Sequence, residues 1–445
     1  MEIKNYKTFF AGKRVLVMGL GILGRGVGDA QFLAEQGAQV VVTDRKSAAE
    51  LKESVERLKV FPHISFHLGR HSEQDFIDTD MVIKAAGVRM DSPEIAAARA
   101  AGVPVYMSTA LAAKFAMENG VKVVGVTGTR GKSTVAHMIH HALVAAGSAS
   151  RRSAHLGGNI RGVSTLAMLP TITKDDVLVL ELDSWQLQGF GDLELSPHVA
   201  VFTNLMPDHQ NYYPDMQKYF HDKANIFRFQ KKGDSLIAIP ELAKQIQDVG
   251  AGGDAYRTHI EAPAPMEWKL EMPGEHNRVN AALAAASLEV LGLTAPEIRA
   301  GLESFGGVEG RLQFVREIDG VKIYNDNNAT TPEATIAALQ ALDAGGKNII
   351  LIMGGADKGL YLDALVEGIK KACKAAVFLK GSGTDRLSEE MPGYRYDDLE
   401  LAVKAAFKQA EAGDVLLFSP AFASFGMFKN EYDRNDRFLK IVSKI

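Results

Sequence analysis

The segment TGTRGKST at residues 127–134 has the residue types and spacing needed to hold a nucleoside triphosphate. Small residues let successive backbone N–H groups surround phosphate oxygens, Lys132 can reach the outer phosphates, and the hydroxyl of Ser133 can bind Mg²⁺. Val126 replaces the first glycine of the general G-x-x-x-x-G-K-S/T pattern, but strand, loop and helix patterns follow in the required order. We therefore predict a triphosphate site with the contacts Gly128, Thr129, Gly131, Lys132, Ser133 and Thr134.

A second glycine turn, GLGILG, follows an apolar run near the N-terminus. Gly19, Gly21 and Gly24 fit the G-x-G-x-x-G pattern, and Asp44 ends the next apolar run 20 residues past Gly24. In dinucleotide enzymes such a turn binds a diphosphate at a helix N-terminus, while the acidic residue binds a ribose. The turn indicates a second phosphate site, although a tight turn without a ligand would give the same pattern.

Acidic and imidazole groups follow two further apolar runs. Glu181 comes at the end of VLVLEL, and Asp208 and His209 follow HVAVFTN within NLMPDH. Open α/β sheets bind ligands at the carboxyl ends of their strands, and Mg²⁺ on a triphosphate takes oxygen ligands. We therefore expect these side chains to form a magnesium site beside the triphosphate.

The apolar runs that must position these residues alternate with helical patterns, which is typical of parallel α/β sheets. We expect three such domains, at residues 1–110, 111–307 and 308–445. The helix after the triphosphate loop has apolar residues at i, i+3 and i+4 spacing and Gly147 as its expected end. The expected strands lie within residues 14–19, 38–44, 81–87, 103–108, 121–127, 177–182, 198–204, 321–326, 347–355, 375–381 and 414–420.

Length and composition exclude several classes of protein. The 445 residues are enough for about three domains. A net charge of −4 provides no basic field for nucleic acid or an anionic membrane. The single cysteine, Cys373, excludes an internal disulfide and a cysteine-rich metal site. There is no signal-peptide pattern and no apolar run near the ~20 residues of a membrane span, so we expect a cytoplasmic protein.

Two other patterns do not indicate catalysis. His137, His140 and His141 include an HxxxH pair, but without the glutamate of HExxH they favour a solvated helix face. Ser184 lacks the G-x-S-x-G context of a serine hydrolase.

Four motifs follow one another along the chain: TGTRGKS, ELDSWQLQ, NLMPDH and GEHNRVNAALAA. With them, nearly the whole chain resembles the Mur ligase family, which forms amide bonds on peptidoglycan precursors using ATP. The turn GLGILG and the C-terminal SPAFASFGMFKNEYDR make it most similar to the MurD type, which adds D-glutamate to UDP-N-acetylmuramoyl-L-alanine.

This resemblance implies a fold and a reaction. The fold would have a Rossmann-like UDP-binding domain, a central P-loop ATPase-like domain and a Rossmann-like C-terminal domain, in a monomer. The reaction would transfer the γ-phosphoryl group of ATP to a carboxylate. The amine of glutamate would then attack the resulting acyl phosphate, with release of ADP and phosphate.

The resemblance also implies roles for individual residues. Lys132 and Ser133 would hold ATP phosphates and Mg²⁺, and Glu181 and His209 would be magnesium ligands at two metal sites. Lys223 matches a lysine that the family carbamylates, which would turn a cation into an anionic oxygen ligand. The remaining ATP contacts, to adenine, phosphate and ribose, would come from Asn280, Arg311 and Asp326.

The resemblance implies substrate contacts on all three domains, with the UDP diphosphate instead of NAD on the first. Asn159, in GGNI, matches a residue near the reacting carboxyl group. Lys358, Ser424 and Phe425 match residues that bind the incoming amino acid. The UDP-linked substrate would contact Gly19, Gly21, Ile22, Leu23, Asp44, Arg45 and Gly87.

Two departures from the family pattern leave alternatives open. Asn328 stands in place of the lysine of DSKAT, and Glu431 stands where an aromatic residue usually follows FKN. The loss of a cation and the gain of an anion should weaken the hold on glutamate, so a ligase that adds L-glutamate is an alternative. An NAD-dependent oxidoreductase would leave the triphosphate loop without a role. A silent nucleotide-binding regulator would not need Glu181, His209 and Lys223 together.

Overall fold

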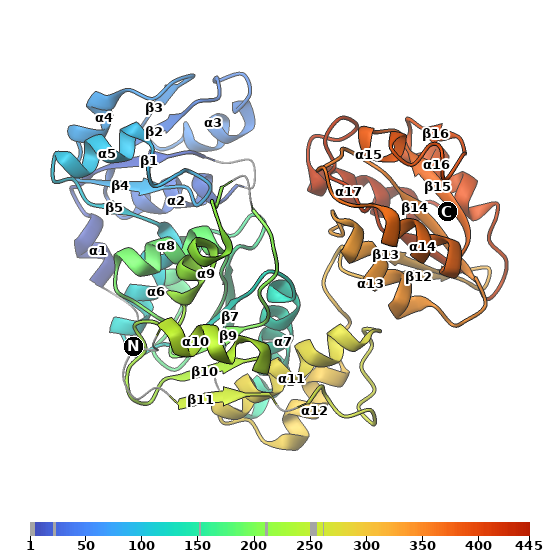
Figure 1. Cartoon of the computed structure of the whole chain (residues 1–445). Helices are drawn as coiled ribbons and strands as arrows, with labels where there is room; N and C mark the ends of the chain where they lie inside the picture. Colours follow the sequence, from blue (N-terminus) through green and yellow to red (C-terminus); the bar gives the residue numbers. More distant parts are fainter. Residues whose placement is uncertain (1–4, 21–23, 151–152, 210–211, 250–255, 261) are drawn as a thin grey trace. The chain divides into compact units, whose positions relative to one another are not determined.

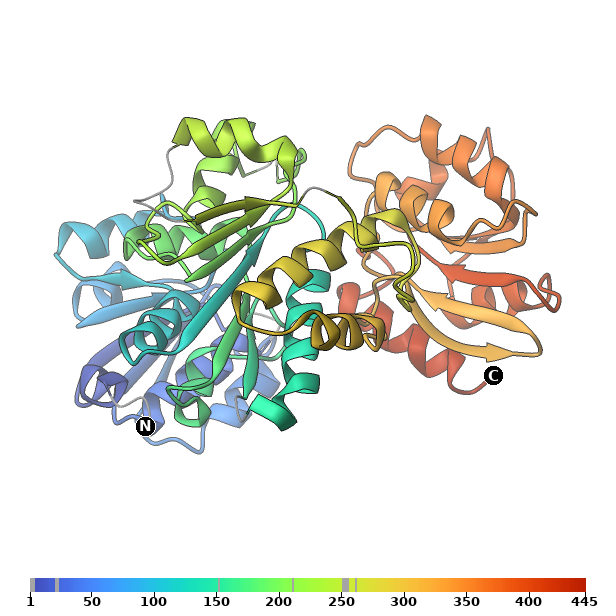
Figure 2. The same ribbon diagram turned by 90° about the horizontal axis from the view of Figure 1, so that it is seen from below.

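The computed structural model describes residues 5–20, 24–150, 153–209, 212–249, 256–260 and 262–445. The chain folds into two compact units. Unit 1 holds Met1–Ala262 and Ala282–Gly301, and unit 2 holds Pro263–Ala281 and Leu302–Ile445. In both units, helices pack on sheets that are wholly or mainly parallel (Figures 1 and 2).

The first sheet of unit 1 has five parallel strands in the order β3-β2-β1-β4-β5. Because parallel neighbours need crossovers, helices connect them. The order reverses at β1, and open sheets bind ligands at such a point. The strands are β1 (Arg14–Met18), β2 (Gln39–Asp44), β3 (Ile64–Leu68), β4 (Met81–Lys84) and β5 (Val105–Tyr106). The helices are α1 (Asn5–Phe10), α2 (Arg25–Glu35), α3 (Lys52–Leu58), α4 (Glu73–Ile77), α5 (Pro93–Ala100) and α6 (Ser108–Glu118).

The second sheet of unit 1 has six parallel strands in the order β11-β10-β9-β6-β8-β7. Its centre is β6, which lies between β8 and β9. The strands are β6 (Lys122–Thr127), β7 (Ala154–Gly158), β8 (Val177–Glu181), β9 (Val199–Phe202), β10 (Ser235–Ala238) and β11 (Tyr256–His259). The helices that follow are α7 (Lys132–Ser150), α8 (Ser184–Asp192), α9 (Met216–Ala224), α10 (Ala243–Val249), α11 (Glu275–Val290) and α12 (Ala295–Glu303), with short 3₁₀ turns η1 (Leu166–Thr171) and η2 (Pro240–Leu242).

One apolar core joins the two sheets of unit 1. Helix α6 leads from β5 into β6 and packs against η1 and α8. Its buried alanines permit this close packing because they add little volume; they are Ala110, Ala112, Ala113 and Ala116. The first sheet is thereby packed against the domain that carries the triphosphate loop.

Unit 2 has one six-stranded sheet in the order β12-β13-β17-β14-β15-β16. The β12–β13 pair is antiparallel and the other pairs are parallel. The strands are β12 (Gln313–Ile318), β13 (Val321–Asn325), β14 (Ile349–Met353), β15 (Cys373–Leu379), β16 (Arg395–Tyr396) and β17 (Val415–Phe418). The helices are α13 (Pro332–Leu342), α14 (Asp363–Ala372), α15 (Ser382–Asp385), α16 (Leu399–Phe407) and α17 (Glu431–Val442).

The structure confirms the predicted α/β class, and each expected apolar run overlaps a strand. The expected end of a helix at Gly147 is wrong, because α7 continues to Ser150. The solvated histidine face is also wrong. His137, His140 and His141 are half-buried, and Nε2 of His140 lies 3.2 Å from the carbonyl oxygen of Ala154. In the part of the chain that the structure describes, no helix has the length and apolar character needed to cross a membrane.

Candidate active site

The loop between β6 and α7 forms hydrogen bonds with the segments just beyond β8 and β9, the two strands that flank β6. Thr127 Oγ1 donates to the carbonyl oxygen of Leu182 at 2.8 Å, beyond β8. The backbone N–H groups of Thr129 and Arg130 donate to Asn204, beyond β9, at 3.0 and 2.9 Å. Gly128 has φ 145°, and a Cβ there would collide with the hydroxyl of Thr203. The loop is therefore held in one conformation, at the start of α7.

Lys132 and Ser133 occupy the first turn of α7. The Nζ atom of Lys132 donates to the carbonyl oxygens of Gly128 and Thr129, each at 3.0 Å. Ser133 is buried. A helix N-terminus favours anions, so this loop has the charge and donors that a polyphosphate needs.

Glu181 ends β8 next to this loop and is 3% exposed. Its carboxylate accepts one long hydrogen bond, from Nδ2 of Asn159 at 3.5 Å, and the backbone N–H of Asn159 donates to its carbonyl oxygen at 2.8 Å. Among the described residues it has no ion pair. A buried carboxylate is stable only with a cation or several donors, so Glu181 fits a metal ligand.

Lys223, on α9, is a buried lysine that contacts the triphosphate loop. It is 1% exposed, and its Nζ donates to the carbonyl oxygen of Gly128 at 2.7 Å and lies 3.4 Å from Thr127 Oγ1. Burial, and then the charge of Lys132, lower the pKa of Lys223 well below its ordinary value. Both effects favour the neutral amine, which is the form that reacts with carbon dioxide.

His209 follows β9 and has a left-handed backbone, with φ 53°. Its ring lies 4.7 Å from the ring of Trp185, and its Nε2 lies 3.7 Å from Asp208 Oδ2. Burial lowers the pKa of His209, and the charge of Lys132 lowers it further against the opposing effect of Asp208. The neutral imidazole, which can bind a metal, is therefore favoured.

Within the described residues, no group of three or more His, Cys, Asp or Glu side chains could by itself hold a metal ion. Mg²⁺ at triphosphate sites takes most of its ligands from phosphate oxygens and water and only one or two from protein. The buried hydroxyl of Ser133 and the carboxylate of Glu181 are oxygen donors of the required kind. The residues present therefore fit a nucleotide-bound magnesium.

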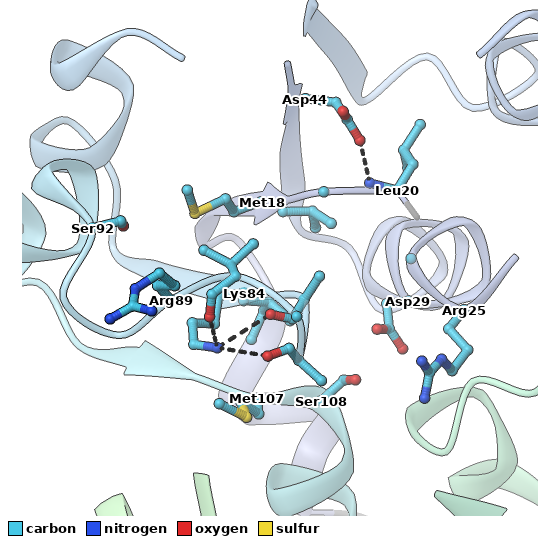
Figure 3. Close-up of a pocket in the computed structure, with 18 of the residues that line it drawn as sticks. Met18, Leu20, Arg25, Asp29, Asp44, Lys84, Arg89, Ser92, Met107 and Ser108 are labelled. Atoms are coloured by element: carbon cyan, nitrogen blue, oxygen red, sulfur yellow. Dashed lines mark hydrogen bonds between the residues drawn. The ribbon is translucent and has the colours of Figure 1, made fainter. Parts of the chain in front are cut away.

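A pocket of about 800 Å³ opens at the carboxyl ends of β1 and β4 (Figure 3). Gly19, Asp44, Arg45 and Gly87, four of the proposed substrate contacts, line it, whereas the proposed contacts 21–23 lie outside the described residues. The carboxylate of Asp44 accepts from the backbone N–H groups of Leu20 at 3.0 Å and Lys46 at 2.9 Å. Asp44 thus holds the glycine turn itself.

Two of the charged pocket residues that were not predicted stand out by their contacts. Lys84 is 2% exposed and donates to the carbonyl oxygens of Ala85, Ala86 and Val88 at 3.2, 3.4 and 2.8 Å (Figure 3). A lysine inside the apolar run MVIK was the one sequence signal for this role. The other residue is Arg25, at the start of α2, which no motif marks.

The remaining predicted ATP contacts lie in unit 2. Asp326, after β13, accepts from the backbone N–H of Leu312 at 3.0 Å and from Ser419 Oγ at 2.8 Å. It therefore lies beside the segment that carries Arg311. Asn280, in the first part of α11, which belongs to unit 2 up to Ala281, is buried and donates to Asn277 Oδ1 at 3.2 Å.

The predicted amino-acid contacts lie beyond the carboxyl ends of β14 and β17, the two central strands of the unit 2 sheet. Residues Ala356 and Ala423 form a bridge between the loops after β14 and β17, which carry Lys358 and Ser424. Lys358 is exposed and donates to Thr330 Oγ1 at 3.1 Å. Ser424 is buried, whereas Phe425 is 66% exposed.

The two departures from the family pattern lie beside a buried arginine that the sequence analysis missed. Arg434 is fully buried and donates to Asn327 Oδ1 and the Asn327 carbonyl oxygen, each at 2.8 Å, and to the Phe422 carbonyl oxygen at 3.2 Å. Asn328 accepts from Asn327 Nδ2 at 3.1 Å. Glu431 begins α17, where an acidic residue favours the helix. The buried cation Arg434 therefore shares a contact residue, Asn327, with the acid gained at Glu431.

Comparisons with known proteins match most of the chain. Three family models match: Mur ligase MurD-like, N-terminal domain at residues 13–107; Mur ligase middle domain at 126–252; and Mur ligase, glutamate ligase domain at 310–422. The UDP-N-acetylmuramoylalanine--D-glutamate ligase of Roseiflexus sp. (strain RS-1) is 37% identical over 97% of this chain and 98% of its own. The protein of that name from Borreliella afzelii (strain PKo) is 32% identical over 100% and 99%.

Solved structures show the same fold at low sequence identity. The UDP-N-acetylmuramate-alanine ligase MurC of Thermotoga maritima superposes with a TM-score of 0.63 at 19% identity, covering 97% of this chain and 99% of that one. The MurF ligase of Thermotoga maritima, solved in complex with ADP, gives a TM-score of 0.60 at 18% identity, with coverage of 98% and 96%.

Proposed function

Because this chain belongs to the Mur ligase family, we propose that it is an ATP-dependent, ADP-forming ligase that joins glutamate to UDP-N-acetylmuramoyl-L-alanine. The observation that carries this proposal is the placement of three groups within unit 1. The buried amine of Lys223 contacts the triphosphate loop, and the buried Glu181 is paired with Val126, the residue of β6 just before that loop, in the unit that also holds the 800 Å³ pocket. Phosphoryl transfer to a carboxylate needs a site for each substrate and a means of neutralising charge.

The reaction activates a carboxylate that does not react with an amine. The loop and Lys132 would bind the phosphates and stabilise the charge that develops as the γ-phosphoryl group moves to the substrate carboxylate oxygen. Asn159 would orient that carboxylate. The amine of glutamate would then form the amide bond, the acyl oxygen would leave with phosphate, and the amine would lose a proton.

Magnesium would neutralise charge on the phosphates during this transfer. Ser133, Glu181 and His209 are the residues proposed to hold it, at two sites. The neutral amine of Lys223 would add to carbon dioxide and lose a proton, which would place a carbamate oxygen beside the loop. A lysine cation at that position would instead repel the metal.

The UDP part of the substrate is proposed to occupy the pocket lined by Gly19, Arg45 and Gly87, and the residues 21–23 remain proposed contacts. Asn280, Arg311 and Asp326 are proposed ATP contacts. Lys358, Ser424 and Phe425 are proposed for the amino acid. We also propose a cytoplasmic monomer with the three domains at residues 1–110, 111–307 and 308–445.

D-glutamate is the proposed amino acid, because relatives that match nearly the whole chain are named for it. L-glutamate is the second candidate, on account of Asn328 and Glu431. Orthophosphate release from ATP tests both, with UDP-N-acetylmuramoyl-L-alanine and either enantiomer. We expect release to require both substrates and to be faster with D-glutamate. Release that neither substrate stimulates would contradict the ligase function, and faster release with L-glutamate would contradict the choice of enantiomer.

A further inference from the structure

Arg25 connects the proposed UDP pocket with the second sheet of unit 1. It is the first residue of α2 and lines the pocket, and its Nη1 donates to Oδ1 of Asn159 at 2.9 Å. The two residues are 134 positions apart, one beside the first sheet and one after β7 of the second. This hydrogen bond therefore joins the two domains of unit 1 at the site.

The contact fixes the orientation of the Asn159 amide. A guanidinium group has only donors, so it can contact only the oxygen of that amide. With the oxygen held by Arg25, the amide nitrogen faces Glu181, and Nδ2 lies 3.5 Å from Oε1 of that carboxylate. Arg25 thus determines which end of the amide meets the buried carboxylate.

The packing of α2 holds Arg25 in this position. A Cβ on Gly28 would lie 2.7 Å from Cβ of Ser164, and Ser164 Oγ donates to Asp29 Oδ1 at 2.5 Å. Figure 3 shows Arg25 and Asp29 on the same side of α2. A cation in the first turn of a helix opposes the helix dipole, so Arg25 does not serve to stabilise α2.

We propose that Arg25 is a positioning residue for the ligase reaction. It orients the Asn159 amide toward Glu181, and so holds the carboxylate in the orientation that receives Mg²⁺. This inference rests on the proposed function. Groups that orient a metal ligand from outside the coordination sphere typically change metal affinity or activity by about 10- to 100-fold.

A double-mutant cycle on the full-length enzyme tests the proposal, with Arg25→Met, Asn159→Ala and the double variant. The two quantities are kcat and the Mg²⁺ concentration that half-saturates binding of a non-hydrolysable ATP analogue, measured by calorimetry. Arg25→Met alone should lower kcat and raise that Mg²⁺ concentration about 10-fold or more, with KM for the UDP-linked substrate changed less than about threefold. With Asn159→Ala present, the same substitution should change neither quantity more than about twofold.

Arg57→Met, on the exposed face of α3, is the matched control and should change neither quantity. Equal effects of Arg25→Met in both backgrounds would overturn the proposal. A rise in KM alone would also overturn it, because Arg25 would then be only a substrate contact. Should Arg25→Met fail to fold, Arg25→Lys, which keeps the charge but lacks the planar fork, goes through the same cycle. An inactive wild-type enzyme would contradict the proposed function, and the calorimetric cycle would still decide the role of Arg25.

Discussion

The Nζ atom of Lys223 lies 2.7 Å from the carbonyl oxygen of Gly128, so a buried amine rests against the triphosphate loop. Three features of Lys223 favour its neutral form: its burial, the absence of an ion-pair partner among the described residues, and the nearby cation Lys132. A neutral amine in this position can be modified to an anion.

Lys223→Ala should therefore lower kcat about 100-fold, because the loop loses the carbamate proposed to lie beside the metal. Short carboxylic acids such as formate should restore part of the activity by replacing its oxygens. Steady-state assays with and without formate give the answer. Lys218→Ala, on the exposed face of the same helix, is the control and should retain activity. Full activity in untreated Lys223→Ala would remove the carbamate from the mechanism.

Lys84 should shape the pocket rather than take part in the chemistry. Its ammonium group holds three backbone carbonyls of the loop after β4, and burial lowers its pKa to about 8. Lys84→Met would leave these carbonyls without their donor. We expect KM for the UDP-linked substrate to rise about 10-fold while kcat stays within about twofold. Lys52→Met, exposed on α3, should change neither; a loss confined to kcat would show that Lys84 acts in catalysis.

Arg434 should fix the loop that carries the two departures from the family pattern. Its three hydrogen bonds end on Asn327 and Phe422, and burial lowers its pKa to about 10, so it stays charged at neutral pH. Arg434→Met should raise KM for glutamate about 10-fold or more and lower the unfolding temperature, because buried acceptors lose their donors. Arg437→Met, three residues further along α17 at an exposed position, is the control and should leave KM for glutamate unchanged. An unchanged KM for glutamate would separate Arg434 from the amino-acid site.

The carboxyl of Asp29 should make stability depend on pH. Burial raises its pKa from 3.8 to about 6, so the folded state favours the protonated form. Its contribution to stability is complete below pH 3.8 and is lost as the pH rises through 6. Asp29→Asn cannot ionise. Between pH 5 and pH 8, the wild type should therefore lose about 1 kcal/mol of stability relative to this variant.

Urea unfolding midpoints at the two pH values measure this difference. Asp78→Asn, at an exposed position after α4, should show no such difference from the wild type. Parallel pH profiles for the wild type and Asp29→Asn would contradict the raised pKa.

The central strands could be predicted from the sequence, and the strands at the sheet edges mostly could not. Strands such as β8 and β14 are buried on both faces and have continuous apolar runs. The unpredicted strands β3, β7, β11, β12 and β16 all lie at sheet edges. In β3, half-buried and exposed residues alternate, so no continuous run marks it. The short inner strand β10 was also missed.

The residues of the candidate site also fall into those that the sequence could predict and those that it could not. The triphosphate loop is local in sequence, so its glycines, Lys132 and Ser133 could be identified by pattern. Arg25, Lys84 and Arg434 are single charged residues whose partners are amide or carbonyl groups. Only the tertiary fold brings Arg25 to Asn159, across 134 positions, so no spacing in the sequence could predict it.

The proposed mechanism requires the enzyme to phosphorylate a substrate carboxylate before the amide bond forms. Oxygen transfer tests this directly, with UDP-N-acetylmuramoyl-L-alanine labelled with ¹⁸O in its alanine carboxylate. The released orthophosphate is analysed by mass spectrometry. We predict that each phosphate released with amide product carries one labelled oxygen, because the acyl oxygen leaves with the phosphoryl group. Amide product accompanied by unlabelled phosphate would contradict the account.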